Sequence, residues 1–108
     1  MPEDFWGILI PPLVGKSFYT LKRGREFRVE EMSDTYLLIV TSARHPRRLS
    51  RKELEGAWVA LTHRGALTWQ QIWQQFSEFH SAYVAAILAR MPGVEHRLNP
   101  ITLIYREA

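Results

Sequence analysis

Basic side chains are concentrated between residues 44 and 52. This stretch holds five Lys or Arg residues and one His, with no acid among them. Such a run could bind phosphate groups, because side-chain charge and the unpaired N–H groups of a helix N-terminus would act together. The phosphate-binding candidates here are Arg44, Arg47, Arg48, Arg51 and Lys52. A solvated basic loop that pairs with neighbouring acids is the alternative interpretation.

The charge is unevenly distributed over the whole chain. Residues 16–52 contain ten basic and four acidic side chains, whereas residues 53–108 contain four and five, so the net charge of +3 conceals a basic half. Lys22, Arg23 and Arg25 surround Gly24 in a short turn-like segment. They could form a second basic finger that follows a nucleic-acid backbone or enters a minor groove, although a turn is also expected to be polar.

Other kinds of chemistry find little support in the residues. The chain has no cysteine, which excludes disulfides, thiolate zinc sites and cysteine nucleophiles. His45, His63, His80 and His96 are dispersed, and none has a partner at metal-ligand spacing on one helix face. There is also no glycine-rich loop before a helix that could hold a nucleotide. We therefore expect no enzymatic activity, no cofactor and no metal.

The first half of the chain has the pattern of strands. Aromatic and β-branched residues dominate 18–21, 26–32 and 35–41, separated by turn residues, which predicts an antiparallel sheet of three strands or of four if 47–49 joins it. The continuous apolar run 36–40 predicts a central strand covered on both faces. Before the sheet, Phe5, Trp6, Ile8 and Leu9 are expected to pack on the domain as a flap, with an exposed partner-binding strip as the alternative.

The second half has the apolar spacing of three short helices. Capping boxes at Ser50/Glu53 and Thr68/Gln71 predict helices over 51–64 and 69–76, the first ending at Gly65 in the left-handed conformation. A third helix begins after Ser77 or Ser81 and stops at Pro92. A terminal strand follows over 101–105. The apolar helical positions place Trp58, Trp69 and Trp73 in the core, rather than on a surface that stacks bases.

These elements predict a single domain over 1–108 of the α+β class. It comprises an N-terminal flap (1–16), a β-sheet (17–49), three helices (50–92) and a β-wing with the terminal strand (93–108). No signal peptide and no apolar run of membrane-spanning length is visible. We therefore expect a cytoplasmic protein with no membrane partner.

The arrangement over 50–106, a short helix, a brief turn, a third helix and the hairpin 94–105, resembles the helix-turn-helix of the winged-helix family. A fainter similarity, carried by Phe27-Arg28-Val29, Arg47-Arg48-Leu49, Leu67-Thr68 and 83–88, is to small modules of bacterial restriction and defence proteins. The family resemblance implies a DNA partner, duplex rather than another nucleic acid, with the third helix in the major groove. The additional contacts that it implies are His80, Ser81, Tyr83, Arg90 and Arg97.

The third helix departs from the family pattern because its outer face is rich in alanine rather than in Arg, Lys, Asn or Gln. The small residues are Ala82, Ala85, Ala86 and Ala89. A face of small residues suits close packing, either against the protein's own sheet or, where it is exposed, against a partner helix. The alternative function is therefore a protein-interaction module, such as a phage or mobile-element inhibitor, that binds a protein partner or self-associates through this face.

Overall fold

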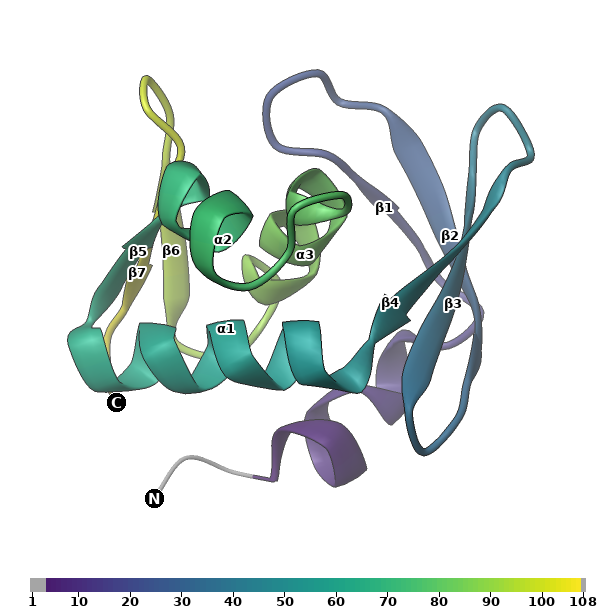
Figure 1. Cartoon of the computed structure of the whole chain (residues 1–108), viewed down its shortest axis with the longest axis horizontal. Coiled ribbons are helices and arrows are strands. Elements are labelled where there is room, and N and C mark those ends of the chain that lie inside the picture. Colours follow the sequence, from purple (N-terminus) through teal and green to yellow (C-terminus); the bar gives the residue numbers. More distant parts are fainter. Residues whose placement is uncertain (1–3, 108) are drawn as a thin grey trace.

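The structure is a computed structural model that describes residues 4–107 and contains two antiparallel sheets with helices between them (Figure 1). The α+β class expected from the sequence is confirmed. The first sheet has the strand order β1-β2-β3-β4. Its strands are β1 (Ser17–Tyr19), β2 (Glu26–Met32), β3 (Tyr36–Thr41) and β4 (Pro46–Ser50). The predicted fourth strand is thus present, and it forms one edge of the sheet.

One face of the first sheet, which we call its inner face, packs against the helices. Phe27, Val29, Leu37 and Ile39 alternate with outward-facing residues and are buried on this face. The expectation that β3 is covered on both faces was wrong in part. Its outward side chains, exemplified by Tyr36, are half-buried, because the helices lie on the inner side only.

The two predicted capping boxes are both present. Helix α1 (Arg51–Arg64) begins at the Ser50/Glu53 box and ends at Gly65, whose φ of 83° is left-handed. Helix α2 (Trp69–Gln75) begins at the Thr68/Gln71 box. Helix α3 (Ser81–Leu88) differs from expectation, because neither serine caps it: its N-cap residue is His80, which makes no side-chain capping bond.

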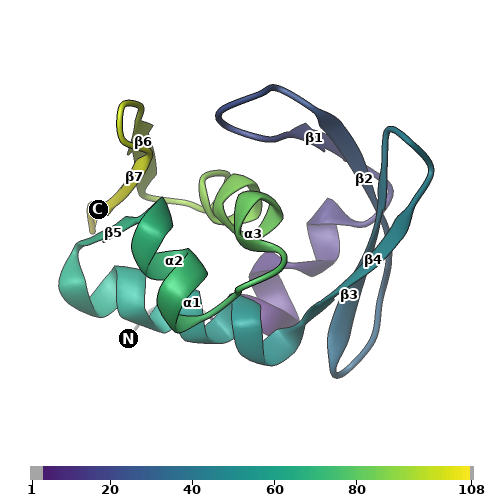
Figure 2. The same ribbon diagram turned by 45° about the horizontal axis from the view of Figure 1, so that its top comes forward.

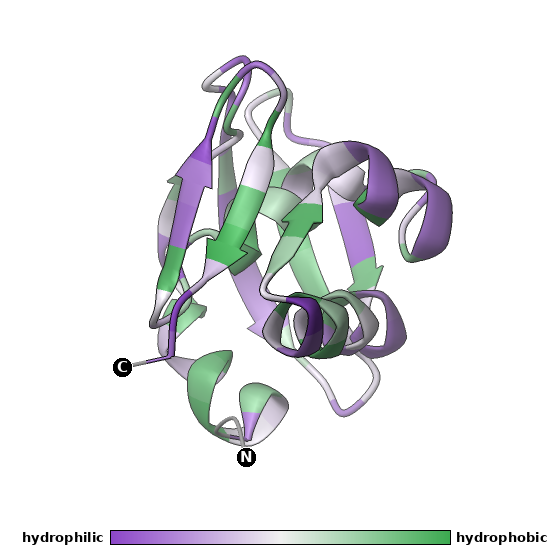
Figure 3. Cartoon of the chain, turned by 90° about the vertical axis from the view of Figure 1, so that its left-hand side faces the viewer, coloured by the Kyte–Doolittle hydropathy of each residue, from purple (hydrophilic) through white to green (hydrophobic). Residues whose placement is uncertain are grey.

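A second, three-stranded sheet joins the helices. Its strands are β5 (Ala66–Thr68), β6 (Val94–Arg97) and β7 (Thr102–Tyr105), in the order β5-β7-β6. In Figure 3 the hydrophobic β7 lies beside the hydrophilic β6. Strand β5 was not expected from the sequence, since only Leu67 of its three residues is buried and its pairing with Leu103 is distant in sequence.

The N-terminal segment forms a π-helical turn (Phe5–Leu9) and a 3-10 turn (Pro11–Leu13). Phe5 and Trp6 are buried, so the expectation of a packed flap is confirmed for them. It was wrong for Ile8, which is 56% exposed. The Phe5 ring stacks on Trp58 with 5.4 Å between ring centroids, which connects the flap to α1.

One buried apolar cluster runs through the flap, both sheets and all three α-helices. Helix α3 lies at its centre, between the two sheets (Figure 2). Val84, Ala85, Ala86, Ile87 and Leu88 are all buried. Within residues 4–107, no helix is long and apolar enough to cross a membrane.

Candidate nucleic-acid interface

Two hairpin loops share one edge of the first sheet. In an antiparallel meander, the β1–β2 and β3–β4 connections must lie at the same end of the strands and the β2–β3 turn at the opposite end, and the word edge refers below to these two ends. We call these the hairpin edge (residues 20–25 and 42–45) and the turn edge (residues 33–35 with the start of α1). The β6–β7 loop rises on the same side of the molecule as the hairpin edge (Figures 1 and 2).

A cleft separates the β1–β2 loop from the β6–β7 loop and is made of three adjoining hollows that share Trp69 and Ile101. We call it the tryptophan cleft. A hollow of about 270 Å³ lies under the β1–β2 loop and is lined by Thr20, Lys22, Arg23, Arg25, Trp69, Ala82, Tyr83, Ala85 and Ile101. A hollow of about 370 Å³ joins that loop to the β6–β7 loop and is lined by Lys22, Trp69, Leu98, Asn99, Pro100 and Ile101.

The largest of the three, which we call the indole hollow, has a volume of about 680 Å³. It is lined by Thr68, Trp69, Gln70, Trp73, Glu78, Ser81, Pro100 and Ile101. Trp69 is 37% exposed and Trp73 is 48% exposed. Because they are four residues apart on α2, the two indoles project from neighbouring turns of the same helix face. The expectation that both tryptophans are core residues was therefore wrong, whereas Trp58 is buried as expected.

Trp69 is held by two hydrogen bonds. Its indole Nε1–H donates to Ser81 Oγ at 2.9 Å, which connects it to α3. Its backbone N–H donates to the carbonyl of Ile101 at 3.0 Å, which connects it to the end of the β6–β7 loop. The preceding residue, Thr68, is the cap of α2. The ring is therefore fixed in position before any ligand arrives.

The β1–β2 loop supplies the positive charge of the cleft. Lys22, Arg23 and Arg25 are exposed, and no ion pair involves them within residues 4–107. Lys22 Nζ lies 6.0 Å from the centroid of the Trp69 ring, at the outer range of a cation–π contact. Gly24 has a φ of 62°, so the loop uses the conformational freedom expected of this glycine. Arg97, exposed at the end of β6, lines none of the three hollows.

The predicted basic loop over 44–52 has a different structure. Arg44 occupies the β3–β4 turn with a left-handed φ of 63°, while Arg47 and Arg48 lie on the edge strand β4. The Arg48 guanidinium stacks on Tyr36, 4.8 Å from the ring centroid, on the outward face of the sheet. These cations therefore extend across the sheet from the hairpin edge toward the turn edge, rather than converging on one loop.

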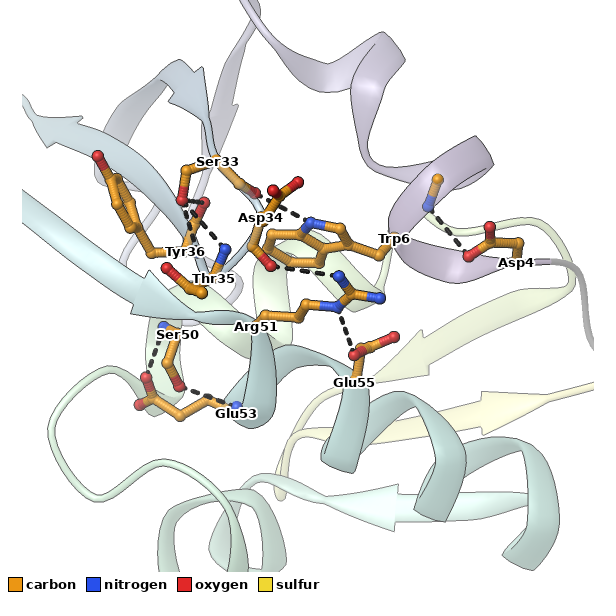
Figure 4. Close-up of polar contacts among 11 residues, drawn as sticks. Asp4, Trp6, Ser33, Asp34, Thr35, Tyr36, Ser50, Arg51, Glu53 and Glu55 are labelled. Atoms are coloured by element: carbon orange, nitrogen blue, oxygen red, sulfur yellow. Dashed lines mark hydrogen bonds and ion pairs between the residues drawn. The ribbon is translucent and has the colours of Figure 1, made fainter.

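Arg51 and the α1 N-terminus belong to the fold at the turn edge (Figure 4). Arg51 Nε donates to Glu55 Oε1 at 2.7 Å and Nη1 donates to the Asp34 carbonyl at 3.2 Å, with the guanidinium 5.4 Å from the Trp6 ring centroid. The N–H groups of Ser50, Arg51 and Glu53 are all bonded within the chain. The expectation that these groups offer unpaired donors to phosphate was wrong. Lys52, by contrast, is exposed.

Helix α3 has few exposed side chains that could enter a DNA groove. Ser81 is buried, Tyr83 is half-buried with its ring 5.2 Å from that of Phe27, and His80 is half-buried. Arg90 is exposed, and its guanidinium lies 5.8 Å from the Phe18 ring centroid. The first sheet covers the outer face that the resemblance to the winged-helix family assigned to DNA.

The alanines of α3 face the same covering sheet. Ala85 and Ala86 are buried, and only Ala82 and Ala89 are partly exposed. Of the two arrangements expected for this face, packing against the protein's own sheet is the one observed, and the alternative of an exposed four-alanine stripe was wrong. Small side chains at these positions let β1 and β2 approach the helix closely, since helix α3 contacts β1 directly.

Glu53 connects α1 to the turn before α3. Its carboxylate accepts hydrogen bonds from Ser77 Oγ at 2.7 Å and from the Ser50 N–H at 2.8 Å, and His80 Nδ1 lies 3.4 Å away. Burial raises the pKa of Glu53, but the hydrogen bonds from Ser77 and Ser50 and the charge of His80 lower it to a net value below the ordinary 4.5. The Ser77 hydroxyl thus donates to a carboxylate, an arrangement that holds the turn in place. Among residues 4–107, no group of three or more His, Cys, Asp or Glu could hold a metal ion.

The hairpin 94–105 was expected as a wing that contacts DNA, whereas the exposed indoles that its loop faces were not predicted from the sequence. No local signal separates these indoles from core residues, because Trp69, Ile72 and Trp73 share one helix face by their spacing although only Ile72 is fully buried. Searches against protein-family models, curated proteins and solved structures give no match to the chain, so its function has to be inferred from this geometry.

Proposed function

We propose that the chain is a non-catalytic nucleic-acid-binding module of the winged-helix type, with DNA as its partner. The observation that carries the proposal is the tryptophan cleft, in which Lys22, Arg23 and Arg25 have no acidic partner among residues 4–107 and face the exposed Trp69. Unpaired cations next to an exposed aromatic ring match a ligand that carries both phosphates and bases.

The order of elements supports the winged-helix assignment. Helix α1, strand β5, helices α2 and α3 and the hairpin β6–β7 follow one another, and β5 pairs with β7 to close the second sheet. This order is that of a helix-turn-helix unit followed by a wing. The first sheet is an additional layer that covers α3. DNA would therefore contact the cleft between the β1–β2 loop and the wing, rather than receive α3 in its major groove.

A salt-dependent binding measurement tests the proposal. Fluorescence anisotropy would follow a labelled duplex and its single strand between about 50 and 200 mM salt, where phosphate contacts weaken steeply. The variant K22Q/R23Q/R25Q should bind on the order of a hundredfold more weakly than the wild type at about 0.1 M salt, because three phosphate contacts are lost. The matched control K16Q/R48Q/K52Q removes the same charge away from the cleft and should bind nearly as well as the wild type. Absence of salt-dependent binding to either nucleic acid would reject the proposal.

A protein-docking role is the second candidate function, and one observation favours it. Phe79, in the turn between α2 and α3, is 82% exposed, so this large apolar side chain is available to a protein partner. In this role the chain, acting for example as a phage or mobile-element inhibitor, would bind a protein partner or a second copy of itself through Phe79 rather than through the buried alanines. Sedimentation analysis of the wild type and of Phe79→Ser would detect self-association. A wild type that stays monomeric at high concentration argues against that form of docking.

A further inference from the structure

We infer that the indole hollow binds an unpaired nucleobase, so that the preferred ligand is single-stranded DNA rather than a fully paired duplex. The inference rests on the proposed function and makes it more specific. The strand would pass its phosphates along the β1–β2 loop and insert one base beside Trp69 and Trp73. In a paired duplex, the faces of a base are stacked on its neighbours, so only an unpaired base can present them to an indole.

The size and composition of the hollow suit a base. Its volume of about 680 Å³ is within the range of sites that hold small organic ligands. Two half-exposed indoles provide flat aromatic surfaces, and Pro100 and Ile101 add apolar lining. Stacking on an aromatic ring is a general way to bind a base, because every base has a π face.

The hollow is also organised in advance. Trp69 is fixed by its bond to Ser81 Oγ and by its backbone bond to Ile101. A ring that is already in place loses little conformational entropy when a base stacks on it. The Ser81 hydroxyl accepts from Trp69, so its own proton is available to a ligand in the same hollow.

Charge divides the cleft into a phosphate side and a base side. Lys22, Arg23 and Arg25 line the hollows next to the β1–β2 loop. Glu78 and Gln70 line the indole hollow instead. The carboxylate of Glu78 repels phosphate but accepts a hydrogen bond from an exocyclic amino group, such as N4 of cytosine. The indole hollow should therefore favour bases that carry an amino group over thymine.

The experiment measures the affinity of the whole chain for oligo(dC), oligo(dT) and a fully paired duplex of equal length. We expect oligo(dC) to bind more tightly than oligo(dT) and than the duplex. Trp73→Ala should weaken oligo(dC) binding by roughly 5- to 100-fold, the range for loss of one stacked base, while duplex binding changes little. Phe79→Ala is the matched control, because Phe79 is an exposed aromatic residue outside the hollow, and it should leave oligo(dC) binding unchanged.

A second variant keeps the inference testable if Trp73→Ala disturbs the fold. Glu78→Gln should raise the affinity for oligo(dT) and bring the dC-to-dT ratio close to one, because it removes the carboxylate that favours an amino group. Salt-dependent binding with equal affinities for the wild type, Trp73→Ala and Phe79→Ala, or an unchanged ratio in Glu78→Gln, would overturn the inference but leave the proposed function intact. Absence of salt-dependent binding to all three probes would reject the proposed function itself.

Discussion

Arginine and lysine side chains have contrasting surroundings at the two edges of the first sheet. At the turn edge, Arg51 is bonded to Glu55 and to the Asp34 carbonyl, and it lies over the buried Trp6 (Figure 4). At the hairpin edge, Lys22 and its two neighbouring arginines have no acidic partner within residues 4–107, and they face an exposed indole. The first group stabilises the fold, whereas the second is available to a ligand.

The difference shows that a run of cations in a sequence does not by itself locate a phosphate site. The run 44–52 holds more Lys and Arg residues than 22–25, yet its members extend along an edge strand and into the structural contacts of α1. What decides their availability is whether acids and carbonyl groups from other elements satisfy them. The following substitutions test this contrast, starting with the largest expected effect.

Trp6→Ala should lower the free energy of unfolding by about 3–5 kcal/mol, the usual cost of removing a buried tryptophan side chain. The indole is buried, its Nε1–H donates to the Ser33 carbonyl at 3.0 Å, and Arg51 packs on it. Urea denaturation would measure the change. Ile8→Ala, in the same turn but 56% exposed, should have an effect of less than about 0.5 kcal/mol. Equal effects of the two variants would show that the flap does not stabilise the turn edge.

Glu53→Gln should lower the free energy of unfolding by about 1–2 kcal/mol at neutral pH, because one of its serine donors would face an amide N–H instead of an oxygen. The pKa of Glu53 is lowered in the folded chain, so the ionised carboxylate stabilises the fold above its ordinary pKa of 4.5. This stabilisation is lost as the pH falls through the folded pKa. The difference between wild type and variant should therefore be constant near neutrality and shrink below pH 4.5. A difference that grows toward acid pH would contradict this assignment.

Lys22→Gln should weaken binding to a single strand only about fivefold at 0.1 M salt, because one phosphate contact is lost. The unfolding transition should not move, since no salt bridge or side-chain hydrogen bond to the rest of residues 4–107 involves this exposed lysine. Anisotropy titration and thermal denaturation would measure the two quantities. Arg48→Gln removes one charge from the outward face and should leave the affinity unchanged, while loss of its stacking on Tyr36 should lower the free energy of unfolding by about 0.5–1 kcal/mol. A larger loss of affinity for Arg48→Gln than for Lys22→Gln would place the phosphate contact on the outward face of the sheet and not in the tryptophan cleft.

Local signals in the sequence were sufficient to predict some helices and strands and insufficient to predict others. The bounds of α1 follow from a capping box and a left-handed glycine, which are both encoded within a few residues. Strand β5 depends on its pairing with β7, about 36 residues away, so its three residues carry no sufficient signal of their own.

The candidate site was harder to predict for the same reason. The alanine face of α3 is equally compatible with a partner, with DNA and with an internal sheet, and only the position of β1 and β2 decides among them. The turn Lys22 to Arg25 was recognised as basic. Its proximity to Trp69 could not be predicted, because the two segments are about 45 residues apart in the sequence. Periodicity describes which side of a helix is apolar, and it does not determine what covers that side.

The most direct test of the account compares the salt dependence of single-strand binding for the two charge-matched triple variants. If the cations of the β1–β2 loop contact phosphates, K22Q/R23Q/R25Q should reduce the slope of log affinity against log salt by about 2 units, at about 0.7 per contact on a single strand. The control K16Q/R48Q/K52Q should keep the wild-type slope. Equal reductions in the two variants, or a reduction in the control alone, would contradict the claim that the tryptophan cleft is where this chain holds nucleic acid.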